Sequence, residues 1–206
     1  MVIRTERQAH GFIFQDWIIS KFLDMAYTAK WDIPKEINPL SNKSVSIKTA
    51  KYRGGVGLGD ALTQFRINED FQFLVAFYEE SENIKKIVNV QLIDIPLIKW
   101  KEMWGNLTEE KLIELNNFIK SDVGRNINGE ELDKFRANVQ TKKNEILEGY
   151  TGKFSLNPKI DSKTQRRLQC SIGFNTLFET FGLDDEIMMT CELWGENLKL
   201  SSIPLS

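Results

Sequence analysis

The sequence is poor in the residues from which most enzyme sites are built. Its 206 residues include one histidine, His10, and two cysteines, Cys170 and Cys191. A single imidazole cannot supply a histidine-based zinc site or a Ser-His-Asp relay, so His10 is interpreted as a structural or surface residue. The cysteines lack a CxxC spacing and form no disulfide framework. These absences exclude the common zinc and serine hydrolases and predict a reduced, cytoplasmic protein.

Long apolar runs and an excess of one charge are also missing. No run approaches the roughly 20 apolar residues that span a bilayer, and the beginning, MVIRTERQAHG, has no apolar signal-peptide core, so no membrane partner is expected. The 27 Lys and Arg residues nearly balance 29 Asp and Glu residues. Nucleic-acid binding therefore cannot be argued from total charge. With 41% hydrophobic and 27% charged residues, the composition is that of a globular protein.

The order of sequence patterns predicts an α/β (α+β) fold over a single domain, residues 1–206. Helical spacing of apolar residues indicates a helix over 9–26, and residues 44–51, 71–77 and 84–95 are typical of strands. Glycines at 54, 55, 57 and 59 predict a turn. Further helices are expected after Pro96, from Thr108, over 130–147 and over 173–181, and an extended polar stretch over 150–172. The prediction is a mixed central sheet flanked by helices.

One constellation can carry chemistry. Ser46 and Lys48 alternate on a predicted strand and so share a face, and Asp32 lies on a short segment just before it. A carboxylate can hold Mg2+ through oxygen, and an ammonium can position water or neutralise charge on a phosphate. The pattern favours metal-assisted phosphodiester hydrolysis. The structural alternative is an incidental Asp–Lys pair.

An amphipathic helix, the segment Trp31-Asp32-Ile33-Pro34 and the strand Ser46-Ile47-Lys48 together resemble the PD-(D/E)xK nuclease superfamily, specifically type II restriction endonucleases. The resemblance covers about residues 9–95. It implies a restriction-endonuclease-like fold with a catalytic core over about 9–105, and recognition elements over about 106–206. It also implies Asp32, Ser46 and Lys48 as catalytic residues. The metal, Mg2+, would be held by Asp32 and the backbone carbonyl of Ile47. Ser46 stands where the family has an acid, so Asp16, Glu36 or Asp60 is expected as second ligand.

A second constellation suits DNA. Residues 153–167 contain five basic residues and one acid, Asp161, and Arg and Gln can each grip a base edge with two hydrogen bonds. The expected DNA contacts are Lys51, Arg53, Lys159, Lys163, Gln165, Arg166, Arg167 and Gln169. On an extended strand Arg166 and Arg167 face opposite sides, so at most one of them points into the groove. An exposed basic loop without function is the alternative.

These observations lead to an Mg2+-dependent endonuclease that cuts double-stranded DNA at a short sequence. One site per chain cuts one strand, so a homodimer is expected. Two alternatives stay open. Ser46 in place of an acid suits a non-catalytic nucleic-acid-binding module of the same fold, and the third possibility is an unrelated α/β interaction protein.

Overall fold

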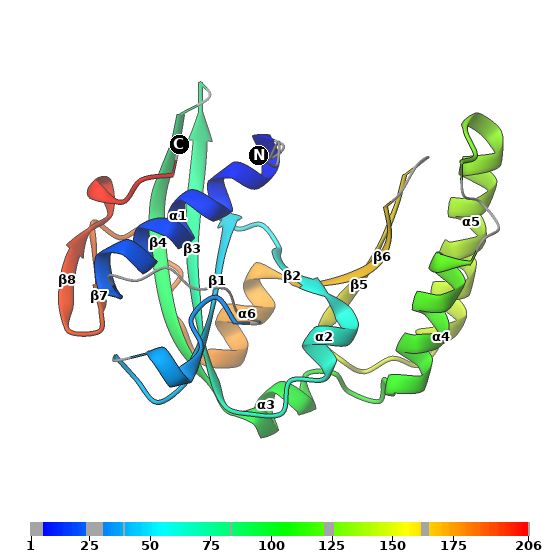
Figure 1. The fold of residues 1–206 in the computed structure, drawn as a ribbon, viewed down its shortest axis with the longest axis horizontal. Coiled ribbons are helices and arrows are strands. Elements are labelled where there is room, and N and C mark those ends of the chain that lie inside the picture. Colours follow the sequence, from blue (N-terminus) through cyan, green and yellow to red (C-terminus); the bar gives the residue numbers. More distant parts are fainter. Residues whose placement is uncertain are drawn as a thin grey trace. The chain divides into compact units, whose positions relative to one another are not determined.

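The structure, a computed structural model, describes residues 6–23, 31–38, 40–82, 84–121, 126–161 and 165–205. The chain is mixed α/β and divides into two compact units that interleave along the sequence (Figure 1). The first unit takes residues 1–56, 69–97 and 173–206, and the second takes 57–68 and 98–172. The C-terminal segment 173–206 thus belongs with the first unit.

The sheet of the first unit has the strand order β1-β3-β4. The strands are β1 (Ser44–Lys51), β3 (Phe71–Ser81) and β4 (Ile84–Ile95). β1 runs parallel to β3 with Ser44 opposite Phe71, and β3 runs antiparallel to β4 with Phe71 opposite Ile95. All three predicted strands are confirmed, and the strand predicted over 71–77 continues to Ser81. The sheet is therefore mixed, as expected.

Helices of the first unit pack on opposite faces of this sheet (Figure 1). On α1 (Glu6–Phe22), Phe14 and Ile18 are buried in one core with Ile47 and Leu74. On α6 (Phe174–Phe181), the rings of Phe174 and Phe178 contact Phe77, which lies on the other face because neighbouring strand residues alternate. The helix predicted over 9–26 is confirmed up to Phe22, where α1 ends, and residues 24–26 lie outside the described residues.

Two short elements and a C-terminal hairpin complete the first unit. They are η1 (Lys35–Ile37), η2 (Leu200–Ser202), β7 (Thr190–Leu193) and β8 (Glu196–Lys199). The hairpin was not predicted. Its buried Cys191, Leu193 and Leu198 join the core that includes Phe14 and Ile47.

The second unit contains a sheet of order β2-β6-β5 and four helices. Its elements are β2 (Val56–Asp60), α2 (Ala61–Phe65), α3 (Leu97–Glu102), α4 (Glu109–Lys120), α5 (Gly129–Ile146), β5 (Phe154–Ile160) and β6 (Arg166–Ile172). Trp100 and Trp104 are buried against Phe154. Thr108 caps α4 as predicted, since its side chain accepts a hydrogen bond from the Lys111 N–H.

The glycine-rich segment 54–59 was wrongly predicted to be wholly a turn. Only Gly54 and Gly55 belong to the connection, because β2 begins at Val56 and pairs with β6. Val56 and Leu58 are buried while Gly57 is exposed, which is the alternation of a strand with one covered face. Pairing with β6 thus outweighed the weak strand propensity of glycine. In the part of the chain that the structure describes, no helix is long and apolar enough to cross a membrane.

Candidate functional site

Asp32 lies beside the edge strand β1. Pro34 biases the preceding residue, Ile33, towards an extended backbone. Ile33 forms an antiparallel bridge with Val45: the Val45 N–H donates to the Ile33 oxygen at 2.7 Å, and the Ile33 N–H donates to the Val45 oxygen at 3.1 Å. The neighbouring Trp31 ring packs 5.2 Å from the ring of Phe71 on β3. This local pairing brings Asp32 next to Ser46.

The structure brings together the four residues predicted to form the site. Asp32 Oδ2 accepts hydrogen bonds from the Ile47 N–H at 2.7 Å, from Lys48 Nζ at 3.0 Å and from Ser46 Oγ at 3.4 Å. Lys48 Nζ also donates to the Ile47 carbonyl at 2.8 Å. The Asp32 and Lys48 side chains are 23% and 24% exposed, so the pair is partly shielded but reachable.

These contacts also provide hydrogen-bond partners for backbone groups at the open edge of the sheet. β1 is the outer strand, and beyond Val45 its edge is covered by side chains rather than by another strand. The Asp32 carboxylate accepts from the Ile47 N–H, and the Lys48 ammonium donates to the Ile47 carbonyl. The pair therefore has a structural role in addition to any catalytic one, and experiments must separate the two.

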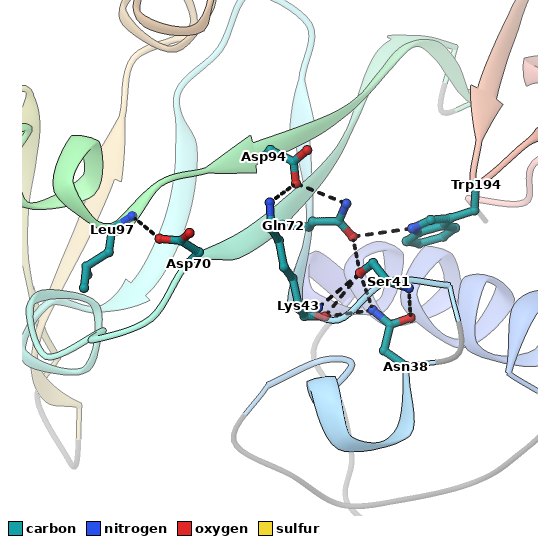
Figure 2. A network of polar contacts seen from close by, with 8 residues as sticks. All are labelled: Asn38, Ser41, Lys43, Asp70, Gln72, Asp94, Leu97 and Trp194. Atoms are coloured by element: carbon teal, nitrogen blue, oxygen red, sulfur yellow. Dashed lines mark hydrogen bonds and ion pairs between the residues drawn. The ribbon is translucent and has the colours of Figure 1, made fainter.

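A polar network fixes the loop that joins Asp32 to β1 (Figure 2). Asn38 Nδ2 donates to the backbone oxygen of Lys43 at 2.8 Å, and Ser41 Oγ donates to Gln72 Oε1 on β3 at 2.9 Å. Lys43 Nζ forms an ion pair with Asp94 on β4 at 2.8 Å. Each bond ties the loop to itself or to the sheet, so the network holds β1 and the Asp32 segment in register.

The oxygen atoms available at this cluster fit a hard cation. Asp32 Oδ1 accepts no hydrogen bond from a described residue, and the Ile47 carbonyl and Ser46 hydroxyl lie at the same strand edge. Mg2+ prefers oxygen ligands and often takes only one or two carboxylates, with water and substrate phosphate filling the remaining positions. Asp32, the Ile47 carbonyl and Ser46 would hold the ion.

The second acidic ligand is not identified. Asp16 is exposed on α1, and among the described residues it makes no hydrogen bond or ion pair with Asp32. Glu36 is exposed on η1. Asp60 belongs to the second unit, where its carboxylate caps α2 by accepting from the Thr63 N–H at 2.8 Å. Within the described ranges no group of three Asp, Glu, His or Cys side chains is placed to bind a metal.

Glu69, which no sequence pattern indicated, lies just before β3, and its carboxylate contacts Ser44 at the start of β1. Its Oε1 accepts from Ser44 Oγ at 3.2 Å and its Oε2 pairs with Lys35 at 2.5 Å. The hydrogen bond from Lys35 lowers the pKa of Glu69 below its usual value, against the opposing effect of burial. Ser44, Ser46 and Lys48 share one face of β1, so Glu69 lies at one end of the row that carries the site. The position of Glu69 beside Ser44 follows from the parallel pairing of β1 with β3, which the sequence alone does not reveal.

The expected DNA-contacting residues fall into two groups, one in each unit. Lys51 and Arg53 follow the site on β1 and are exposed, and they line a cleft of about 410 Å³ together with Glu79 and Glu80. In the second unit, Lys159, Gln165 and Arg167 are exposed and Gln169 is partly exposed. Lys163 lies outside the described residues.

Arg166 is placed differently from the other basic residues. It is only 8% exposed, and its guanidinium donates to the backbone oxygens of Asp161 and Gln165 and lies 5.3 Å from the centre of the Phe135 ring. Arg167, the next residue, is exposed. The predicted opposite orientation of the two arginines is thus seen. Arg166 anchors the β5–β6 hairpin to α5, and Arg167 is the one presented to solvent.

Comparison with known family models, curated proteins and solved structures found no match for this chain.

Proposed function

We propose that this protein is an Mg2+-dependent endonuclease that hydrolyses phosphodiester bonds of double-stranded DNA at a specific sequence, acting as a homodimer. One observation carries the proposal: the Asp32 carboxylate, the Ile47 carbonyl and the Lys48 ammonium meet at one strand edge, at separations of 3.0 Å and 2.8 Å from Lys48 Nζ. Acidic oxygen, neutral oxygen and cation are the groups that phosphodiester hydrolysis needs side by side.

Lys48 has a donor to spare for the substrate. An ammonium carries three N–H donors, and the contacts with Asp32 and Ile47 use two of them. The third can bind a phosphate oxygen or the attacking water. During hydrolysis the water oxygen bonds to phosphorus, the bond to the leaving oxygen breaks, and that oxygen takes up a proton. Negative charge grows on the phosphate oxygens, so Lys48 stabilises the transition state more than the ground state.

Asp32 has the complementary role. Its Oδ2 orients Lys48 and the Ile47 backbone, while Oδ1 stays available for a cation. Mg2+ bound there would neutralise phosphate charge and lower the pKa of water. A homodimer would provide two such sites, as the cutting of both strands requires.

The test is incubation of plasmid DNA with wild-type protein in Mg2+ and in EDTA. Discrete fragments in Mg2+ alone are expected. Asp32→Asn keeps an oxygen acceptor for the Ile47 N–H but removes the charge, so it should abolish cleavage and retain DNA binding in Ca2+. Glu196→Gln is the matched control, because it removes a carboxylate that pairs with Lys21 at 2.7 Å in the same unit but outside the cluster and its supporting network. Full cleavage by Asp32→Asn, or by wild type in EDTA, would contradict the proposal.

A further inference from the structure

The outer face of the β2-β6-β5 sheet is entirely polar or bare. The side chains that point inward, such as Leu156, Leu168 and Cys170, are buried in the second unit. The alternate positions form what is here called the polar face: Ser155, Asn157, Lys159, Arg167, Gln169 and Ser171, with Gly57 and Gly59 on β2. Ser155 and Asn157 were not among the residues expected to contact DNA. No apolar side chain belongs to this face.

The register of β5 and β6 places side chains of the same chemical type directly opposite each other on the polar face. Lys159 is directly opposite Arg167, Asn157 is opposite Gln169, and Ser155 is opposite Ser171. Like charges in directly opposed positions destabilise a sheet. Within the described part of the chain neither Lys159 nor Arg167 forms an ion pair, and Asp161 at the hairpin end uses its carboxylate on the Gln165 N–H at 2.7 Å. An anion bound between the two cations would relieve their repulsion.

The glycines keep the adjacent strand open. A Cβ built on Gly57 would meet no atom within 4 Å, so nothing within the protein requires glycine at that position, whereas the φ of +93° at Gly59 is a backbone conformation that itself favours glycine. Glycine inside a strand weakens it and often marks a place where a ligand or another backbone approaches closely. Beside the row of hydrogen-bond donors on β6, β2 therefore offers a strip of bare backbone.

We infer that the polar face binds double-stranded DNA, with Lys159 and Arg167 on phosphates and the amides of Asn157 and Gln169 turned to base edges in the major groove. The identity of the ligand rests on the proposed nuclease function. Charge complementarity favours a polyanion, and a β-ribbon fits the major groove. Amide side chains pair best with adenine N6 and N7, so the recognition sequence should contain adenine at the position Gln169 reads. Asn157 Nδ2 donates to the Ser171 hydroxyl at 2.8 Å and to the Ser155 carbonyl at 3.2 Å, which fixes the amide and leaves its Oδ1 to accept from a base edge.

The experiment measures binding without cleavage. Fluorescence anisotropy in EDTA, with a duplex selected by the wild-type protein from a randomised pool, gives affinity against salt. Lys159→Ala and Arg167→Ala should each reduce the salt slope by about one. Gln169→Ala should keep the slope and lose the preference at one base. The control Lys134→Ala removes an exposed cation from α5 and should change neither.

Gly57→Thr separates binding from folding. Threonine suits a strand and Gly57 has open space around it, so the variant should melt no lower than wild type. Its added side chain should nevertheless weaken DNA binding at unchanged salt slope. Wild-type affinity in this variant, equal effects of Arg167→Ala and Lys134→Ala, or tighter binding of single-stranded RNA than of duplex DNA would each overturn the inference. DNA binding through the polar face without cleavage in Mg2+ would refute only the nuclease. Cleavage that ignores these substitutions would refute only the polar face.

Discussion

Replacing Lys48 with alanine tests whether this lysine is catalytic or only structural. The contacts that Lys48 makes set an upper limit on the unfolding free energy that the substitution can cost. The substitution removes a hydrogen bond to the Ile47 carbonyl and an ion pair with Asp32. The side chains of Asp32 and Lys48 are each about a quarter exposed. Asp32 keeps its bond to the Ile47 N–H at 2.7 Å. One hydrogen bond and one partly exposed pair contribute about 1 kcal/mol together, which lowers the melting temperature by about 2–4 °C in a chain of this size.

The catalytic loss should be much larger. Removing a positioned electrostatic donor typically costs about 100-fold in rate, equivalent to about 2.7 kcal/mol in activation free energy. A protein stable by about 5 kcal/mol or more stays over 99% folded after losing about 1 kcal/mol. Unfolding therefore cannot account for a 100-fold fall. Affinity for DNA in Ca2+ should change little, since Lys48 acts mainly on the transition state.

The assay is single-turnover cleavage of a labelled duplex with enzyme in excess, with a melting curve from the same preparation. Lys21→Ala is the matched control: Lys21 pairs with Glu196 at 2.7 Å in the same unit but outside the network that supports the site, so this variant should match the small melting shift without any change in rate. The catalytic assignment of Lys48 fails if Lys48→Ala cleaves at the wild-type rate. It also fails if the rate loss is reproduced by Lys21→Ala.

Three further predictions test the surroundings of the site. Ser46→Asp adds a second carboxylate beside Asp32, so this variant should melt at a lower temperature than wild type in EDTA. Mg2+ should raise the melting temperature of the variant more than that of wild type. A melting temperature that does not respond to Mg2+ would argue against a metal at this edge. Arg166→Ala removes a buried guanidinium with several partners and should cost about 1–3 kcal/mol in urea unfolding, while leaving the salt slope of DNA binding unchanged. The pKa of Glu69 is lowered, chiefly by its hydrogen bond from Lys35, so its contribution to stability is present above the unfolded-state pKa of about 4.3 and is lost as the pH falls through the folded value. Glu69→Gln should therefore be less stable than wild type at neutral pH, and the difference measured by urea unfolding should shrink below about pH 4.

The sequence predicted best those elements in which the spacing of apolar residues matches the side of the element that is buried. The bounds expected for β1 and β4, 44–51 and 84–95, match the structure, since alternation and β-branched residues carry the same information as the pleat. β2 was missed because its pairing with β6 is remote in sequence and glycine gives no strand signal. The β7–β8 hairpin turns at Trp194 and Gly195, both with positive φ, and tryptophan at such a position is not a recognised turn signal.

For the candidate site, the sequence predicted that Asp32 would approach Ser46 and Lys48, and the structure shows this contact. It could not predict that the Asp32 carboxylate would bind the backbone of Ile47, which depends on the bridge between Ile33 and Val45. Glu69 was missed for the same kind of reason, since a parallel partner strand brings together residues with no characteristic spacing. Burial of Arg166 depends on Phe135 of α5, a contact that alternation along β6 does not specify.

The position of the cluster at a sheet edge suits the proposed chemistry. Inside a sheet, backbone N–H and C=O groups are used by the ladder on both sides, so a carbonyl there cannot be offered to a cation or a substrate. On β1, Lys48 is the only described residue that donates a hydrogen bond to the Ile47 carbonyl, and its side chain can move, whereas a neighbouring strand could not. Because the side chains of one acid and one lysine bind its backbone, the edge strand is protected from pairing with other chains. These side-chain bonds can still break to expose the Ile47 carbonyl. The structural role of Asp32 and Lys48 and their proposed catalytic role are compatible for this reason, and rate and stability measured together distinguish them.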